Sequence, residues 1–123
     1  MIVSITGGTG FIGSELVKRH LEMNDTVRVL SRNDEKYPTQ FGTDKIKYII
    51  GDITDNNTDF YEFLKDTDVL YHCAGEFYNQ NKMVSINLAG TNNICKAAAG
   101  KIKHMIYISS VSVYGNIKNK IID

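Results

Sequence analysis

The sequence M-I-V-S-I-T-G-G-T-G-F-I-G, residues 1–13, decides the fold. It begins as an apolar run, breaks into glycines and continues with a helical pattern. Gly7, Gly10 and Gly13 form G-x-x-G-x-x-G, while Gly8 with the last two forms G-x-G-x-x-G. A strand that ends in such a turn and opens a helix directs backbone N–H groups and the positive helix end to one point, where a pyrophosphate can bind. The stretch therefore predicts a dinucleotide-binding turn; the alternative is a tight turn that binds nothing.

Length and composition narrow the possible classes of protein. The chain has 123 residues, of which 42% are hydrophobic and 23% charged, and this predicts one domain with a core of its own. Fourteen basic residues balance fourteen acidic ones without a long basic run, so nucleic acid is not an expected partner. No segment approaches the length of a membrane span, and we expect a soluble, cytoplasmic protein. Cys73 and Cys95 lack metal-ligand spacing, so we expect two buried, reduced thiols and no metal site.

Strand and helix patterns alternate along the chain. Helices are predicted at residues 11–23, 58–64 and 79–100, and strands at residues 2–5, 26–30, 45–50, 68–75 and 103–109. Residues 33–44 are interpreted as a loop or a short helix. The pattern predicts an α/β fold with a doubly wound parallel sheet in the order 3-2-1-4-5 and a ligand between strands 1 and 4. On the first helix the apolar side is expected to hold Phe11, Ile12, Leu16, Val17 and Leu21.

The end of the second predicted strand indicates which dinucleotide is bound. In a dinucleotide fold an acidic residue here would hydrogen-bond the adenosine 2′-hydroxyl, but this place holds Ser31 with Arg32 beside it. A hydroxyl and a guanidinium suit a 2′-phosphate, because they offer donors and positive charge. The sequence therefore favours NADP(H) over NAD(H); the alternative is that Arg32 is a solvated loop residue.

Two further strand ends carry candidate site residues. Asp52 follows the third strand and can accept a hydrogen bond from an adenine amino group, with Ile53 covering the ring; the alternative is a turn aspartate. Ala74 and Gly75 end the fourth strand and are small, as expected where a backbone lies against a cofactor. His72, just before them, is interpreted as a packed strand residue.

Five motifs in this sequence resemble those of one family. They are T-G-G-T-G-F-I-G (6–13), G-D-I (51–53), H-C-A-G (72–75), I-N-L-A-G-T-N-N (86–93) and I-S-S-V-S-V-Y-G (108–115). Together they resemble the extended short-chain dehydrogenase/reductase family, and within it the NAD-dependent epimerase/dehydratase group that acts on nucleotide sugars. The resemblance implies that pyrophosphate is bound by Gly7, Gly10, Phe11, Ile12 and Gly13.

The same resemblance assigns the remaining site residues. It places Ser31 and Arg32 at the adenosine ribose or its phosphate, Asp52 and Ile53 at the adenine, and Ala74 and Gly75 on the adenosine side. Asn87 resembles a helix asparagine that supports the catalytic lysine through water, and Ser110 matches a serine that polarises the substrate. Asn87 also interrupts an apolar helical face, so its amide is expected to be hydrogen-bonded.

The sequence departs from the family in its acid/base pair. A tyrosine and a lysine four residues later normally follow the V-Y-G segment, whereas the two matches here, Tyr78 with Lys82 and Tyr114 with Lys118, both look accidental. We therefore expect residues 1–115 to be an incomplete NAD(P)-binding domain and residues 116–123 a polar tail, with the substrate part absent. The expected function is the cofactor-binding half of a nucleotide-sugar epimerase, dehydratase or reductase, inactive alone. The alternatives are a non-catalytic NADP(H) sensor and a self-associating fragment; a homodimer or other self-association is expected.

Overall fold

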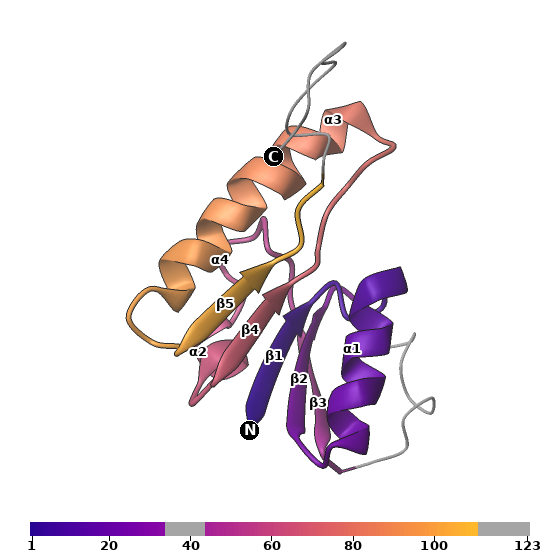
Figure 1. Ribbon diagram of the computed structural model, residues 1–123. Coiled ribbons are helices and arrows are strands. Elements are labelled where there is room, and N and C mark those ends of the chain that lie inside the picture. Colours follow the sequence, from indigo (N-terminus) through magenta and orange to yellow (C-terminus); the bar gives the residue numbers. More distant parts are fainter. Residues whose placement is uncertain (34–43, 111–123) are drawn as a thin grey trace, which may run out of the picture.

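A computed structural model of the chain describes residues 1–33 and 44–110. Its strands form one parallel sheet in the order β3-β2-β1-β4-β5 (Figure 1). The predicted fold class and strand order are both confirmed. The strands are β1 (Ile2–Thr6), β2 (Thr26–Ser31), β3 (Ile46–Ile50), β4 (Val69–His72) and β5 (His104–Tyr107). The helical segments are α1 (Phe11–Glu22), α2 (Phe60–Leu64), α3 (Gln80–Met83), the π-helical η1 (Val84–Gly90) and α4 (Thr91–Ala98).

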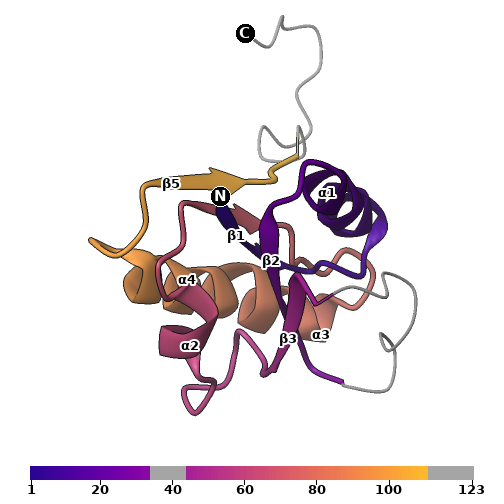
Figure 2. The same ribbon diagram turned by 90° about the horizontal axis from the view of Figure 1, so that it is seen from below.

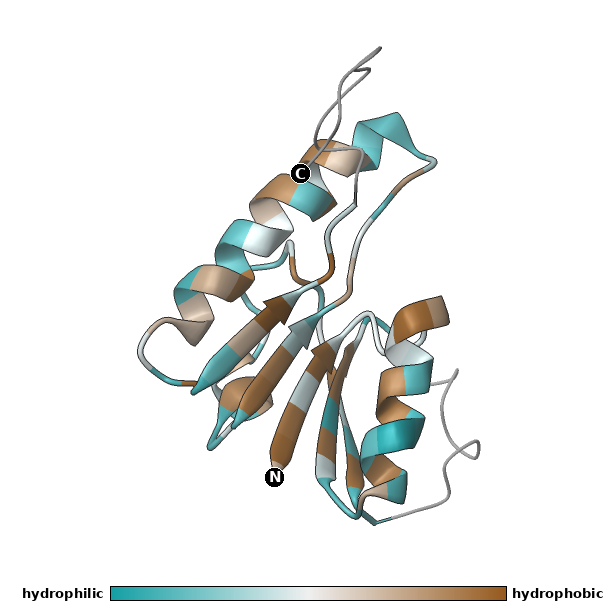
Figure 3. Cartoon of the chain, viewed as in Figure 1, coloured by the Kyte–Doolittle hydropathy of each residue, from teal (hydrophilic) through white to brown (hydrophobic). Residues whose placement is uncertain are grey.

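Helices cover the two faces of the sheet unequally. Figure 2 shows α1 on one face and α2, α3 and α4 on the other, and the strands between them are largely hydrophobic (Figure 3). Each layer has its own core, because side chains of successive strand residues point to opposite faces. Under α1 the buried residues are Val3, Ile5, Val17, Val27 and Val29. Under α2 and α4 they are Leu30, Ile49, Ile53, Phe63, Leu64, Leu70, Ile94 and Ala98.

The first helix differs from its prediction at its amino end. Its buried line runs through Gly13, Val17 and His20, at the spacing of one helical face. Phe11 is 95% exposed and Ile12 46% exposed, so placing them on the buried side was wrong. Both belong to the first turn of α1, before the line of burial begins.

The long predicted helix exists but is not uniform. It begins at Gln80, where the Asn79 side chain accepts a hydrogen bond from the Asn81 N–H, and it ends at Ala98. Gly100 follows with φ +71°, the left-handed conformation that commonly ends a helix. Between these ends η1 is π-helical, a form that is rare and concentrated at functional sites.

Both cysteines are free, as predicted, but the prediction of burial was wrong for Cys95. Cys95 lies on the exposed side of α4, and Cys73 is half-buried. Burial raises the pKa of the Cys73 thiol to about 11, so it is protonated at neutral pH.

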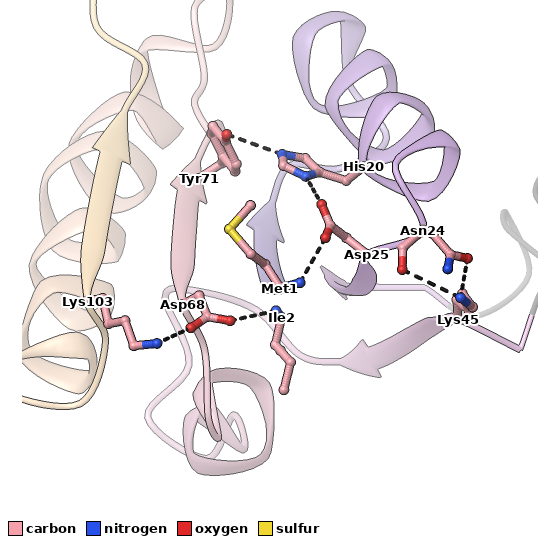
Figure 4. Close-up of polar contacts among 9 residues, drawn as sticks. All are labelled: Met1, Ile2, His20, Asn24, Asp25, Lys45, Asp68, Tyr71 and Lys103. Atoms are coloured by element: carbon pink, nitrogen blue, oxygen red, sulfur yellow. Dashed lines mark hydrogen bonds and ion pairs between the residues drawn. The ribbon is translucent and has the colours of Figure 1, made fainter.

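Two aspartates close the amino-terminal edge of the sheet (Figure 4). Asp25 accepts hydrogen bonds from the His20 ring and the Met1 amino group, both at 2.8 Å, and these bonds, the one from His20 first, lower its pKa. Asp68 accepts the Ile2 N–H at 2.8 Å and pairs with Lys103. These contacts tie β1 to the segments that enter β2 and β4.

No helix within the described part of the chain combines the length and apolar character needed to cross a bilayer.

A buried polar chain links β1, β4 and α4. The Thr6 hydroxyl lies 2.6 Å from Nδ1 of His72, whose Nε2 lies 2.8 Å from the Thr91 hydroxyl. Thr6 also accepts the Ala74 N–H at 3.2 Å. If the Thr6 hydroxyl hydrogen goes to Nδ1, then Nε2 carries the ring proton and donates to Thr91. His72 is fully buried and stacked on Tyr107, which confirms its interpretation as a packed strand residue.

This histidine makes stability depend on pH. Burial lowers the pKa of His72 from 6.5 to about 4, so between these values the unfolded chain binds a proton that the folded chain excludes. The free energy of unfolding is therefore expected to fall as pH drops below 6.5, by about 2 kcal/mol between pH 7 and pH 5. Urea denaturation at a series of pH values measures this change in the free energy of unfolding.

His104→Gln is the matched control, because His104 is an exposed histidine on the neighbouring strand. It should leave the pH dependence unchanged, whereas His72→Gln should lower stability at pH 7 and flatten the slope. An unaltered slope in His72→Gln would contradict this assignment.

Candidate functional site

A crevice of about 500 Å³ lies where the carboxyl ends of the strands meet the following loops. This is the position expected for a ligand in an open parallel sheet, between β1 and β4 where the strand order reverses. The lining residues come from the ends of β1, β2, β3 and β4 and from η1. They are Thr6, Gly7, Thr9, Gly10, Leu30, Ser31, Arg32, Asn33, Gly51, Asp52, Ile53, Cys73, Ala74, Gly75, Glu76 and Ile86.

The glycine turn forms one wall of the crevice. Gly7 has φ +65°, and a Cβ there would lie 2.7 Å from the Ala74 nitrogen. A Cβ on Gly13 would lie 2.1 Å from the Gly7 carbonyl oxygen, and one on Gly8 would lie 2.7 Å from Val29 Cγ1. Packing therefore requires a glycine at each of these three positions.

Gly10 is different, because the protein itself leaves room for a side chain there. Its φ is −75°, and the nearest atom to an added Cβ is the Gly7 oxygen at 3.4 Å. Gly10 caps α1 without a side-chain hydrogen bond, although serine or aspartate would be favourable at such a position. The bare backbone at the amino end of α1 therefore faces the crevice without being required by the fold.

The other predicted pyrophosphate residues do not line the crevice. Phe11 and Ile12 lie on the exposed first turn of α1, and Gly13 is buried beneath the Gly7 carbonyl. Gly13 thus lets α1 approach the turn closely. Gly13 itself does not line the crevice.

Ser31 and Arg32 both line the crevice, but their side chains differ in availability. The Ser31 hydroxyl donates to the Asn33 carbonyl at 2.9 Å and accepts the Asn33 N–H at 3.2 Å, so it shapes the turn after β2. Arg32 is exposed, and within residues 1–33 and 44–110 no hydrogen bond or ion pair engages its guanidinium. Arg32 therefore offers a cation with hydrogen-bond donors at this strand end.

Asp52 and Ile53 line the crevice at the end of the neighbouring strand, β3. One carboxylate oxygen of Asp52 accepts the N–H and the hydroxyl of Thr54, both at 2.8 Å, which is the behaviour of a turn aspartate. The Thr58 hydroxyl bonds the backbone N–H and carbonyl of Asp52, at 2.9 and 2.6 Å. Ile53 is only 6% exposed and packs mainly into the core.

The loop after β4 forms the third wall, and Asn87 holds it. The Asn87 amide accepts the Glu76 N–H and donates to the Glu76 carbonyl, both at 2.8 Å, so the expectation of a bonded amide is confirmed. The Glu76 carboxylate accepts the backbone N–H groups of Tyr78, Asn79 and Phe77, and these bonds lower its pKa. Hydrogen bonds to both the backbone and the carboxylate of Glu76 thus hold the loop in place.

The two predicted catalytic residues lie apart from the lining. Asn87 stands behind Glu76, and Ser110 is exposed just beyond the end of β5. Tyr78 is 96% exposed in the loop that leads to α3, while Tyr114 and Lys118 lie outside the described residues. No group of three or more histidine, cysteine or acidic side chains able to hold a metal occurs in residues 1–33 and 44–110.

The sequence interpretation missed several lining residues, chiefly Thr6, Thr9, Asn33, Glu76 and Ile86. Most of them adjoin a motif that was identified, so their position next to a strand end was an available signal. Ile86 begins the motif of residues 86–93, but that motif does not indicate that Ile86 faces the crevice.

This arrangement suits an elongated anionic ligand. Gly7, Thr9 and Gly10 line the crevice where α1 begins, and the positive end of this helix would stabilise a doubly charged linker there. Arg32 adds a cation at one strand end and Asp52 an acceptor at the next. Burial of apolar side chains such as Ile53 and Ile86 beside these groups suits a ligand with flat, weakly polar parts.

Comparisons with known proteins agree with this geometry. UDP-glucose 4-epimerase of Rickettsia bellii is 31% identical over 123 residues, which cover 86% of this chain and 35% of that protein. Sterol-4-alpha-carboxylate 3-dehydrogenase, decarboxylating, of Mus musculus is 31% identical over 116 residues, 89% of this chain and 30% of that protein. The chain spans about a third of the length of the curated relatives it matches.

A solved structure shows the same architecture with ligands bound. UDP-glucuronic acid 4-epimerase from Bacillus cereus, crystallised as a Y149F mutant with a fluorinated UDP-glucuronic acid and NAD, superposes with a TM-score of 0.76. It is 27% identical, and the match covers all of this chain and 44% of that one. The family model described as NAD dependent epimerase/dehydratase family matches residues 3–122. The glycine turn, the switch-point crevice and these matches together mean that the chain belongs to the NAD-dependent epimerase/dehydratase family.

Proposed function

We propose that this chain is the dinucleotide-binding part of an NAD(P)-dependent epimerase, dehydratase or reductase of nucleotide-sugar type, and that it prefers NADP(H). The observation that carries the proposal is Gly10. The protein has room for a side chain at this position, and serine or aspartate would cap the helix slightly better, so a ligand that approaches the backbone explains the glycine.

The remaining crevice residues fit the two ends of a dinucleotide. A pyrophosphate on the glycine turn would place one nucleoside along the ends of β2 and β3, where Arg32 and Asp52 lie. Asp52 would use its carboxylate oxygen Oδ2, since Oδ1 is engaged by Thr54. Ala74 and Gly75, which also line the crevice, would lie on the adenosine side, and the other nucleoside would extend toward the end of β5.

The preference for NADP(H) is supported by charge. Arg32 offers an unengaged guanidinium among the described residues, and a 2′-phosphate would give it a charge-assisted, bidentate partner. Residues 31–33, the described residues at the end of β2, include no carboxylate that would repel this phosphate or hydrogen-bond a 2′-hydroxyl. The Ser31 hydroxyl, being committed to Asn33, would contribute by shaping the turn.

In the whole protein the bound nicotinamide would supply hydride transfer. Ser110 would polarise the substrate hydroxyl or carbonyl from the end of β5, and Asn87 would keep the neighbouring loop in place. A tyrosine and lysine pair elsewhere in the protein would supply acid/base chemistry, so residues 1–123 alone are proposed to bind the cofactor without turnover. A nucleotide sugar and a second copy of the chain are the proposed partners.

The substitution Gly10→Asp separates dinucleotide binding from folding. Gly10→Asp introduces a favourable cap at the amino end of α1, so thermal or urea stability should stay the same or rise by about 1 kcal/mol. The carboxylate would repel a pyrophosphate, and NADP(H) affinity measured by calorimetry should fall at least about tenfold.

Gly13→Ala serves as the opposite control. Its Cβ would meet the Gly7 oxygen at 2.1 Å, so this variant should lose stability, by about 1–3 kcal/mol or more. Unchanged affinity in Gly10→Asp would contradict binding at the turn. A wild-type chain that binds neither NADP(H) nor NAD(H), or that only self-associates, would contradict the proposed function.

A further prediction concerns the choice of dinucleotide. Arg32→Ala should lower NADP(H) affinity about tenfold to a hundredfold, the range for a lost hydrogen bond between charged groups, and leave NAD(H) affinity unchanged. Arg19→Ala makes the same change in net charge on the exposed side of α1 and should alter neither affinity. Equal loss for both dinucleotides in Arg32→Ala, or a wild type that prefers NAD(H), would contradict the preference.

A further inference from the structure

Ile53 occupies the space that a side chain on η1 would otherwise fill. Gly90, the last residue of η1, is buried, and a Cβ added to it would lie 2.6 Å from Cδ1 and 2.7 Å from Cγ1 of Ile53. Real Cβ atoms do not make contacts this short. A side chain at position 90 and the present position of Ile53 therefore exclude each other. The absence of a side chain at Gly90 thus decides where Ile53 can lie.

Asn93 fixes the backbone of the same residue. It follows Gly90 by three positions, so both lie on neighbouring turns of one helix, and its Nδ2 donates to the Ile53 carbonyl at 2.9 Å. The helix therefore acts on Ile53 twice, by leaving room for its side chain and by holding its carbonyl.

Ile53 lies between the core and the crevice, so the crevice offers it the space if that room is lost. Its side chain packs with Leu30, Phe63 and Ile94 in a core whose members are almost fully buried. Protein cores are close-packed and do not absorb an extra methyl group without displacement. The remaining side of Ile53 faces the crevice, which it lines beside Asp52.

We propose that Gly90 and Asn93 are positioning residues that set the width of the crevice at its Asp52–Ile53 end, and so determine that a purine base fits there. The inference rests on the proposed function, because it takes the adenine of the dinucleotide as the group at this end. Neither residue touches the ligand; both act through Ile53. The size of the base site is thereby set from the helix that lies behind the sheet.

The test is a double-mutant cycle on dinucleotide affinity. Gly90→Ala should lower NADP(H) affinity at least about tenfold, because Ile53 is pushed into the crevice. In an Ile53→Ala background the same Gly90→Ala change should alter affinity less than about twofold, since no side chain remains to be displaced. Calorimetry gives each affinity, and urea denaturation shows that each variant is folded under the conditions used.

Gly100→Ala is the control, just beyond the end of the same helix. Gly100 is exposed with φ +71°, and an added Cβ there would meet nothing within 4 Å, so the substitution strains the backbone far from the crevice. It should reduce stability without changing affinity. Asn93→Ala should weaken NADP(H) binding in the wild-type background, because the Ile53 carbonyl loses its donor.

The outcomes separate this inference from the proposed function. Wild-type affinity in Gly90→Ala, or an equal loss in the wild-type and Ile53→Ala backgrounds, would overturn the inference while leaving dinucleotide binding intact. Failure of the wild-type chain to bind any dinucleotide would overturn the proposed function, and the inference with it.

Discussion

The structure depends on one close contact between segments far apart in the sequence. The turn after β1 lies directly on the backbone that follows β4, with no space for a side chain between Gly7 and Ala74. Gly13 makes a second close contact, beneath the Gly7 carbonyl, and so brings α1 against the same turn. Because neither contact tolerates a Cβ, the amino end of α1 is held at the switch point of the sheet. The crevice, the direction of the helix dipole and the path of the following strands all follow from this placement.

On the face of the sheet away from α1, the helix formed by η1 and α4 supports several walls of the crevice. Asn87 holds the loop after β4, Gly90 and Asn93 hold the segment after β3, and Thr91 reaches β1 through His72 and Thr6. The segments that a ligand would touch are thus supported from one element. The π-helical segment η1 contains the first two of these residues, consistent with the tendency of π-helices to occur where a function demands a particular side-chain placement.

The sequence predicted the sheet and its order because local patterns determine them. Apolar strands, helical spacing and the glycine turn are properties of neighbouring residues, and right-handed crossovers leave few topologies. What it could not predict depends on contacts across the chain. The exposure of Phe11 follows from where α1 meets the sheet, and the exposure of Cys95 from which side of α4 is covered. Likewise the Ser31 hydroxyl appeared available in the sequence, whereas the folded chain engages it with Asn33.

The residues that carry the functional argument are those that the fold alone does not explain. At the amino-terminal edge of the sheet, Asp25 and Asp68 bond backbone, terminal and side-chain donors, and their role is accounted for by stability (Figure 4). At the carboxyl edge, Gly10 caps α1 without a side-chain hydrogen bond, at a cost of roughly a few tenths of a kcal/mol relative to serine or aspartate. Arg32 presents a charge to the crevice with no partner in the described part of the chain. Proteins accept such local losses where a ligand compensates for them, because binding free energy is gained only when the ligand is present. The difference between the two edges therefore identifies the carboxyl edge as the functional one.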